Sequence, residues 1–170
     1  MKLEVKDLAK NVSAAKNFFF EENWESLETS KDKRDKIVFI KPITFKGTAS
    51  NIGATISVSG DINTAVQLTC GRCLKPFDLP IDAGYNQQFC HVKDKGINEE
   101  CSLFDGGIID FTQTVTEELI LSLPMKWICQ EKCQGLCPYC GKDRNENSCG
   151  CKEEDVDPRL EVLKKFFDKE

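Results

Sequence analysis

Hydrophobic and polar side chains alternate along residues 54–70 with a period of two. The hydrophobic positions are the even ones: Ala54, Ile56, Val58, Ile62, Val66, Leu68 and Cys70. A second alternating stretch has its hydrophobic positions on odd numbers: Phe77, Leu79, Ile81, Ala83, Tyr85 and Phe89. Such alternation indicates β-strands with one face against a core and the other in water. Because Cys70-Gly71-Arg72-Cys73 lies between the two stretches, we expect a long antiparallel hairpin with this motif near its turn.

The neighbouring segments predict further strands and a loop. Residues 36–45 are rich in β-branched and aromatic side chains, and they predict one or two strands broken near Pro42. Gly60 falls inside the first alternating stretch, where we expect a glycine to bend or interrupt the strand. Residues 93–108 show no period and carry glycine and charge, so we expect a mobile loop there.

Two helices are expected after the strands. The first should begin with Asp110 as its N-cap and Gln113 three residues later, as in a capping box, and should end before Pro124. The second should begin at Asp157-Pro158, an N-cap followed by proline at the first helical position. The pattern as a whole predicts an α+β protein, strand-rich first and helical later.

Length and composition set the cellular context. A chain of 170 residues suits one domain, or one domain with a small appendage. No apolar stretch of the sequence approaches the ~20 residues needed to span a bilayer. The first ten residues mix charged with apolar side chains, unlike the core of a signal peptide. We therefore expect a cytoplasmic protein, in which close cysteine pairs hold metals or do redox chemistry more often than they form disulfides.

Eight of the ten cysteines occur as four doublets. In chain order, the doublets are Cys70/Cys73, Cys129/Cys133, Cys137/Cys140 and Cys149/Cys151. Each spacing brings two sulfurs together. Cysteines three apart form a Cys-x-x-Cys turn, cysteines four apart share a face of a helical turn, and cysteines two apart share a face of a strand. Because tetrahedral thiolate coordination favours Zn²⁺, with iron as the alternative, we predict that all eight cysteines are zinc ligands.

Four doublets can be combined into two four-sulfur sites in three ways. We favour the third doublet with the fourth, because the loop between them is short and its closure costs little entropy. The first doublet then pairs with the second, which joins the hairpin to the segment after the first helix. The predicted fold is a largely antiparallel sheet with a long hairpin carrying the Cys-x-x-Cys knuckle, followed by helices and a cysteine-rich zinc segment. Its parts are a strand-rich domain over residues 1–128 and a zinc segment with the C-terminal helix over residues 129–170, packed as one unit.

The remaining cysteines and the only histidine are interpreted as structural. We expect Cys90 to be a small buried side chain on a strand, Cys101 a loop thiol, and His91 a surface or core residue rather than a ligand. A site with four thiolate ligands is closed, whereas a catalytic zinc keeps one coordination position open. We therefore predict a binding protein that is not an enzyme and has no small-molecule substrate.

The charge indicates which partners suit the chain. The formal net charge is −5, and two Zn²⁺ ions with eight thiolates would bring it to −9. An acidic protein favours a basic protein partner over a bare phosphate backbone. Two alternatives stay open: a zinc protein that binds RNA or DNA directly, and a thiol redox protein that uses Cys70-Gly71-Arg72-Cys73. The redox alternative requires a helix after the first thiol, whereas the pattern here predicts a strand.

The cysteine motifs and their flanks resemble a known family. Residues 70–77 read C-G-R-C-L-K-P-F and are similar to the C-x-R-C-L-x-P-F motif of the bacterial YceD family, the large ribosomal RNA subunit accumulation proteins. The family's later block is resembled by Leu123-Pro124, residues 129–141, Cys149-Gly150-Cys151 and Asp157-Pro158-Arg159. Family members commonly have Asn-Leu-Asn where this chain has Asp143-Arg144-Asn145.

The resemblance implies a role in the accumulation of large-subunit ribosomal RNA, and hence in ribosome biogenesis. Joined to the acidic, zinc-binding character, it predicts a ribosomal protein or a large-subunit assembly intermediate as the partner, with ribosomal RNA itself as the alternative. Arg72 and Lys75, beside the first doublet, are the candidate partner contacts. Arg72 has a second interpretation as a structural residue paired with a nearby carboxylate, and both interpretations stay open.

Overall fold

The computed structural model describes residues 1–28, 36–53, 55–91, 101–146 and 149–151. Its elements, in chain order, are β1 (Lys2–Glu4), α1 (Lys6–Lys10), β2 (Ala15–Glu22), β3 (Ser26–Glu28), β4 (Lys36–Phe39), β5 (Ile43–Asn51), β6 (Thr55–Thr69), β7 (Pro76–His91), β8 (Ser102–Phe104), β9 (Ile108–Asp110) and α2 (Thr112–Ser122). The sheet is mostly antiparallel and helices are few, which confirms the expected α+β class. None of the described helices is long and apolar enough to cross a membrane.

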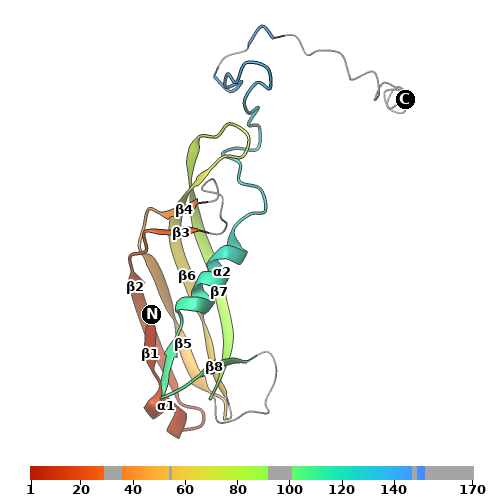
Figure 1. Cartoon of the computed structure of the whole chain (residues 1–170). Coiled ribbons are helices and arrows are strands. Elements are labelled where there is room, and N and C mark those ends of the chain that lie inside the picture. The colour runs from red at the N-terminus through yellow and green to blue at the C-terminus, as the bar shows by residue number, and fades with distance from the viewer. Residues whose placement is uncertain (29–35, 54, 92–100, 147–148, 152–170) are drawn as a thin grey trace, which may run out of the picture.

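The expected long hairpin is formed by β6 and β7. Their antiparallel pairing runs without a break from Thr55 opposite Cys90 to Thr69 opposite Pro76. The buried side chains of β6 include the even-numbered Ile56, Val58 and Ile62, so the period-two pattern is confirmed. At about 3.4 Å per residue the hairpin is about 50 Å long. Figure 1 shows its turn carrying the cysteine-rich segment at one end of the molecule, away from α1 and β8.

Strand β6 is long enough to take two partners along its other edge. Residues 56–63 pair with β5, and residues 66 and 67 pair with β4, so the expected break near Pro42 separates two strands. Strand β2 extends the sheet beyond β5, and β3 extends it beyond β4. The expectation of a loop over residues 93–108 is wrong at residues 102–104, where β8 pairs in parallel with the end of β7, and at Ile108, where β9 begins. Residues 93–100 lie outside the described residues.

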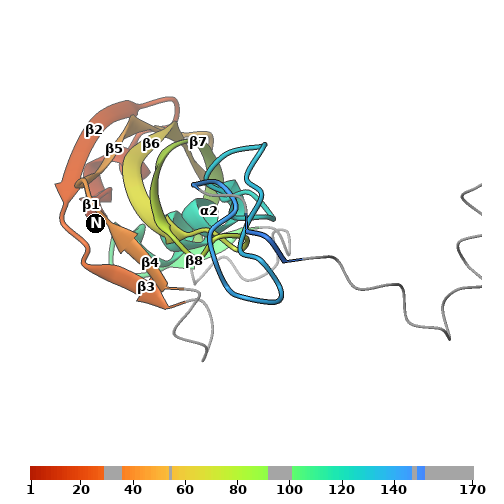
Figure 2. The ribbon, with the colours of Figure 1, turned by 90° about the horizontal axis from the view of Figure 1, so that it is seen from above.

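Gly60 does not interrupt β6, contrary to the sequence-based expectation. It lies opposite Gly47 of β5, and the two backbones approach closely. A Cβ on Gly60 would lie 2.8 Å from the Gly47 Cα, and a Cβ on Gly47 would lie 2.9 Å from the Gly60 Cα. Glycine is therefore required here for close contact between strands rather than for a bend. Figure 2 shows that the sheet curls, with α2 on its inner side.

The core is an aromatic cluster between the curled sheet and α2. Phe111 is fully buried at the start of α2, and its ring lies 5.3 Å from Phe45, 5.5 Å from Phe18 and 5.6 Å from Phe89, measured between centroids. The Tyr85 hydroxyl forms a 2.7 Å hydrogen bond with the Thr114 hydroxyl of α2. These contacts hold the first turn of α2 against β7.

The first predicted helix is present, with a different start. Helix α2 ends at Ser122, before Pro124, as expected, but its N-cap position is Phe111 rather than Asp110. Asp110 ends β9 and accepts hydrogen bonds from the Thr112 N–H and hydroxyl. The Gln113 side chain donates to Glu117 instead of reaching back to form a capping box. The second predicted helix, after Asp157-Pro158, lies outside the described residues.

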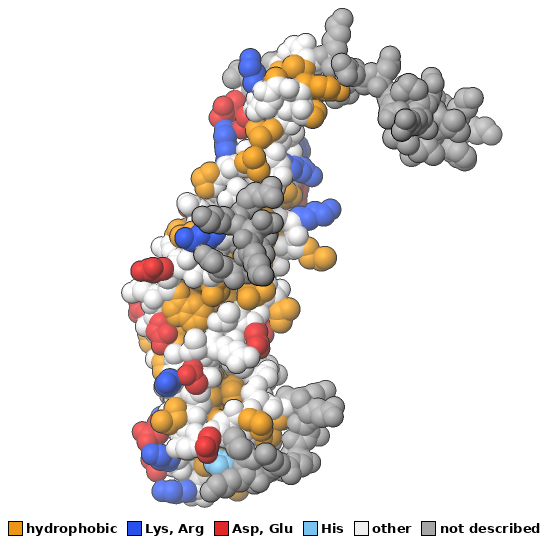
Figure 3. Space-filling view, viewed as in Figure 1, with side chains coloured by type: hydrophobic (Ala, Val, Ile, Leu, Met, Phe, Trp, Pro, Cys, Tyr) orange, Lys and Arg blue, Asp and Glu red, His pale blue; other side chains and the backbone are white. Residues whose placement is uncertain are grey.

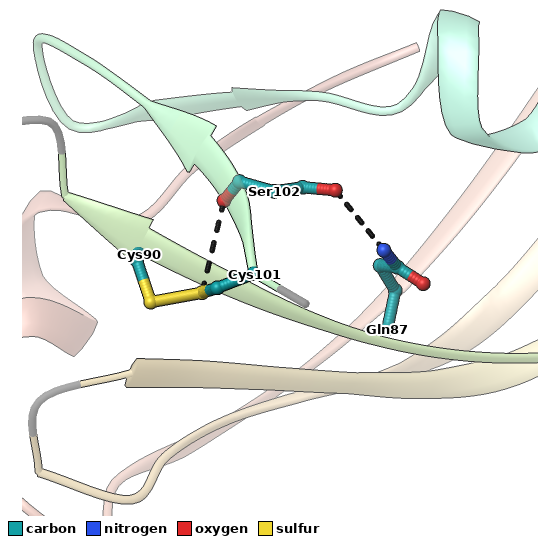
Figure 4. Close-up of a disulfide and its surroundings, with 4 residues drawn as sticks. All are labelled: Gln87, Cys90, Cys101 and Ser102. Carbon is teal, nitrogen blue, oxygen red and sulfur yellow. Dashed lines mark hydrogen bonds between the residues drawn. A yellow bond between two sulfur atoms is a disulfide. The ribbon is translucent and has the colours of Figure 1, made fainter. Parts of the chain in front are cut away.

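Cys90 and Cys101 are joined by a disulfide, which corrects the interpretation of both as separate thiols. Their Cα atoms lie 5.8 Å apart. Cys90 is buried as expected, but β8 returns to the end of β7 and brings Cys101 against it (Figure 4). Nearby, the Gln87 side chain donates to the Ser102 hydroxyl. The bond therefore fastens β8 to the hairpin at the end opposite the other eight cysteines.

Candidate metal centres

The first centre brings the hairpin turn to the segment after α2. It contains the first and second doublets: Cys70, Cys73, Cys129 and Cys133. All four sulfurs lie within 4.8 Å of one another. The Cys70 and Cys133 sulfurs are 3.9 Å apart, and those of Cys73 and Cys129 are 3.8 Å apart. A tetrahedral site with metal–sulfur bonds of about 2.3 Å has its sulfurs about 3.8 Å apart, so these four fit one metal ion.

Backbone hydrogen bonds hold the two cysteine segments of this centre together. The Cys70 N–H donates to the Lys75 carbonyl, and the Leu74 N–H donates to the Cys70 carbonyl, which closes the turn between β6 and β7. Leu74 adopts a positive φ of 59° to do so. The Gly71 N–H donates to the Trp127 carbonyl at 2.8 Å and so holds the second cysteine segment against the turn. The motif thus leads into a strand, not into the helix that a thiol redox pair requires.

Ionisation of one thiol in the first centre opposes ionisation of its neighbours. Burial opposes ionisation of Cys70, but the N–H groups of Cys73, Cys129 and Arg72 lower its pKa to about 6. Burial and the neighbouring sulfurs of Cys133, Cys73 and Cys70 raise the pKa of Cys129 to about 12. One thiolate therefore forms readily and makes the next one harder to form. A bound dication would remove that penalty.

The second centre contains the third and fourth doublets: Cys137, Cys140, Cys149 and Cys151. The preferred pairing of the doublets is thus the one that the structure brings together, and these sulfurs also lie within 4.8 Å of one another. The Gly141 N–H donates to the Cys137 carbonyl, and Gly141 has a φ of 70°, which glycine adopts without strain. The N–H groups of Cys140 and Tyr139 lower the pKa of Cys137 to about 6, while the Cys140 sulfur and burial raise that of Cys151 to about 12.

Both centres have the donors of a structural metal site. Each group contains four cysteines and, among the described residues, no histidine or carboxylate. Four protein sulfurs complete a tetrahedron and leave no position for water or substrate. His91 belongs to neither group; its ring packs edge-on against Phe104 at the opposite end of β7. The residues present therefore fit a closed, all-sulfur site for a metal ion that prefers thiolates.

Arg72 and Lys75 both make contacts inside the chain. The Arg72 Nη1 donates to the Cys133 carbonyl at 2.8 Å and to the Glu131 carbonyl at 3.2 Å. Arg72 therefore has a structural role, although its partners are backbone carbonyls rather than the carboxylate considered from the sequence. Lys75 forms ion pairs with Asp143, at 2.8 Å, and with Glu146. Binding of a partner by either residue stays a prediction.

Two residues that the cysteine pattern did not single out connect the centres. The Asn145 Nδ2 donates to the Cys133 sulfur at 3.5 Å, and the Asn145 Oδ1 accepts the Gln134 N–H at 2.8 Å. Asp143 accepts hydrogen bonds from the N–H and the Nδ2 of Asn145, and it forms an ion pair with Lys75. Both residues belong to the triplet Asp143-Arg144-Asn145, which differs from the Asn-Leu-Asn of the YceD motif. That difference was the signal in the sequence that could have pointed to them.

Comparison with known proteins identifies relatives of this chain. Residues 58–167 match the family described as large ribosomal RNA subunit accumulation protein YceD. The uncharacterized protein YlbN of Bacillus subtilis is 31% identical over 153 residues, which cover 89% of this chain and 88% of that protein. Uncharacterized proteins of Mycobacterium tuberculosis and Mycobacterium leprae are each 26% identical, and the matched parts cover 66% and 59% of this chain and 56% and 48% of theirs. No solved structure matches.

The region that matches the family contains both metal centres. It begins at Val58 within β6 and includes all four doublets, together with Asp143 and Asn145. The similarity to the Bacillus protein extends over most of both chains. The resemblance seen in the motifs is thereby confirmed, and the chain belongs to the YceD family of large ribosomal RNA subunit accumulation proteins.

Proposed function

We propose that this chain is a non-catalytic zinc-binding factor of ribosome biogenesis. In this role it supports accumulation of large-subunit ribosomal RNA by binding a ribosomal protein or an assembly intermediate in the cytoplasm. The observation that carries the proposal is the convergence of eight cysteines on two four-sulfur centres inside the region matched to the family. The family's description supplies the link to large-subunit ribosomal RNA.

A binding role follows from the chemistry of the centres. Zinc held by four thiolates has no open position at which to activate water or to polarise a substrate. Its contribution is to fix the backbone of the cysteine-rich end (described residues 70–75, 124–146 and 149–151), which has few buried apolar side chains of its own. That end therefore presents a fixed surface when metal is bound.

The charge of the chain favours a basic protein partner. The formal net charge is −5 and becomes −9 with two zinc ions on eight thiolates. Ribosomal proteins are rich in Lys and Arg because they contact RNA, so an acidic factor is complementary to them before assembly. In this arrangement Arg72 and Lys75 act first by holding the cysteine-rich end in shape, and their exposed atoms remain candidate contacts.

The test is co-sedimentation of the full chain with large-subunit precursors. A tagged chain replaces the native one, and cell extracts are separated on sucrose gradients at low salt. We expect the protein in fractions that contain large-subunit precursors, loss of that association in Cys137→Ser, and retention in Cys101→Ser, which changes a cysteine outside both centres. Absence of the unaltered protein from those fractions, or zero metal in the freshly purified protein, would overturn the proposal.

Direct RNA binding is the second candidate, and one observation favours it. The described residues of the cysteine-rich end, 70–75, 124–146 and 149–151, carry six basic and three acidic side chains, so basic groups outnumber acidic ones there before the thiolates and metal ions are counted. Figure 3 shows Lys and Arg side chains on that end of the molecule. A gel shift with a large-subunit RNA fragment separates the candidates: affinity for the RNA alone that falls steeply with salt favours RNA, and no shift of the RNA together with capture of a ribosomal protein favours the first proposal.

A further inference from the structure

We propose that the two metal centres bind metal cooperatively, because the loop of the second centre supplies outer hydrogen bonds to the first. The inference rests on the metal binding proposed above and goes beyond it, since two centres in one chain can also fill independently. The residues that carry the coupling are Asp143 and Asn145, which lie in the loop between the two doublets of the second centre, after Cys140 and before Cys149.

Asn145 reaches from the second centre to a sulfur of the first. Its Nδ2 lies 3.5 Å from the Cys133 Sγ and donates to it. Its Oδ1 accepts the N–H of Gln134, the residue after Cys133, at 2.8 Å. A hydrogen bond to a thiolate stabilises its charge, and such outer partners typically alter metal affinity by about 10–100-fold.

Asp143 holds Asn145 in this position and ties it to the hairpin. Its Oδ1 accepts both the Asn145 N–H, at 2.8 Å, and the Asn145 Nδ2, at 2.7 Å. Its Oδ2 faces the Lys75 ammonium at 2.8 Å, and Lys75 follows Cys73 in the hairpin turn. The ion pair is mutual: Asp143 raises the pKa of Lys75, and Lys75 lowers the pKa of Asp143. A continuous chain of polar contacts therefore leads from the first doublet through Asp143 and Asn145 to Cys133.

The backbone between the centres is shared by both. Gly135 has a φ of 73°, and a Cβ there would lie 2.9 Å from the Arg72 carbonyl oxygen of the first centre. The Leu136 N–H donates to that same carbonyl. The Cys137 N–H donates to the Lys142 carbonyl and the Arg144 N–H to the Gly135 carbonyl, so the chain folds back and delivers residues 143–145 to Cys133. Few apolar side chains stabilise this turn, and convergence of the third and fourth doublets on a metal would fix it.

Metal at the second centre should therefore raise the affinity of the first centre for metal. By thermodynamic linkage, metal at the first centre must raise the affinity of the second by the same factor. The experiment uses the full-length, metal-free protein titrated with Co²⁺, whose thiolate charge-transfer absorption reports binding, followed by competition with Zn²⁺. In Cys140→Ser/Cys149→Ser, which removes two ligands of the second centre, we expect the first centre to bind about 10–100-fold more weakly.

Single substitutions locate the coupling in Asn145. Asn145→Ala should weaken the first centre by a similar factor and shift its charge-transfer band to lower energy, because the thiolate loses a hydrogen bond. Asn145→Asp keeps an acceptor for the Gln134 N–H but lacks the Nδ2 donor, so it should not restore affinity; rescue by Asp would mean a packing role and would overturn the proposal. Asn86→Ala, on the exposed face of β7, is the matched control and should change nothing.

Combining the changes gives the decisive result. If the coupling passes through Asn145, the triple variant Asn145→Ala/Cys140→Ser/Cys149→Ser weakens the first centre no more than the larger of the two separate changes. Effects that multiply, or a first centre unaffected by loss of the second, overturn the proposal while leaving metal binding intact. Absence of any Co²⁺ or Zn²⁺ binding by the unaltered chain would remove the proposed function as well, so the two failures are distinguishable.

Discussion

Removal of the metal is expected to unfold the cysteine-rich end and to leave the sheet folded. The sheet has its own core, built from buried side chains of the strands and α2. The only separate buried cluster found among the described residues of the cysteine-rich end consists of Cys70, Cys73 and Cys133, with Phe77 and Ile128 packed against it. Two partly buried apolar side chains are too few to order this end of the chain.

The free energy needed to order this end follows from the number of residues whose backbone must be fixed. The segment 129–146 has 18 residues. Fixing its backbone costs roughly 18–36 kcal/mol of conformational entropy, at about 1–2 kcal/mol per residue. Burial of Phe77 and Ile128 returns at most about 6 kcal/mol. Without metal the ordering cost therefore exceeds the return from burial by roughly 12–30 kcal/mol. A structural zinc contributes an apparent binding free energy of about 10–16 kcal/mol that is already net of ordering its own ligand segment, so we expect this end to order only when metal binds.

Amide hydrogen exchange with and without a zinc chelator measures this directly. The N–H groups of Gly71, Leu136 and Cys137, which donate to backbone carbonyls within the cysteine-rich end, should lose protection when the metal is removed. The amides paired between β6 and β7 should keep it. Cys137→Ser should reproduce the effect around the second centre. Protection that persists in the metal-free end, or loss of the entire sheet in the same step, would refute the reasoning.

Three further predictions concern the frame that holds the centres. Gly60→Ala should lower the free energy of unfolding by about 3 kcal/mol in urea titrations, whereas Gly84→Ala, with open space around its Cβ position, should change it by less than about 1 kcal/mol; equal effects would contradict the close approach. Burial raises the pKa of Tyr85 to about 12 from 10.0. The neutral Tyr85 therefore contributes its full share of the folding free energy below pH 10, and this contribution is lost as the pH rises toward 12. Tyr85→Phe should flatten that part of the stability profile, and an unchanged slope would argue against it. Arg72→Lys should lose about 1.5–3 kcal/mol of stability in the metal-bound protein, because a single ammonium replaces the guanidinium that spans two carbonyl oxygens; an unchanged thermal midpoint would exclude that role.

The hairpin and the doublets were predictable because their signals are local. Alternation at even positions up to Cys70 gives both the strand and the face on which that sulfur lies. The pairing of the doublets followed from loop length, since closing the short loop between the third and fourth costs the least entropy. These features depend on residues close in sequence, and period and spacing report them directly.

The features that were missed depend on residues far apart in sequence. The disulfide between Cys90 and Cys101 exists because β8 returns to β7, and three residues of strand give no readable alternation. Gly47 and Gly60 lie on different strands, and only their register places one against the other. The ion pair between Lys75 and Asp143 spans 68 positions and forms only after the first and second doublets converge. Sequence patterns report which face a side chain occupies but not its partner across the fold.

Phe77 determines how the two centres depend on the sheet. It is partly buried, and it packs against both the main hydrophobic core and the buried cysteines of the first centre. Cys70 is buried directly after the end of β6, in register with the buried even-numbered positions of that strand. The second centre has no such contact with the sheet among the described residues; it is attached through Gly135, Asp143 and Asn145 to the first. The sheet therefore supports the first centre and the first supports the second, so we expect the outer surface of the second centre to be fixed only when both centres hold metal.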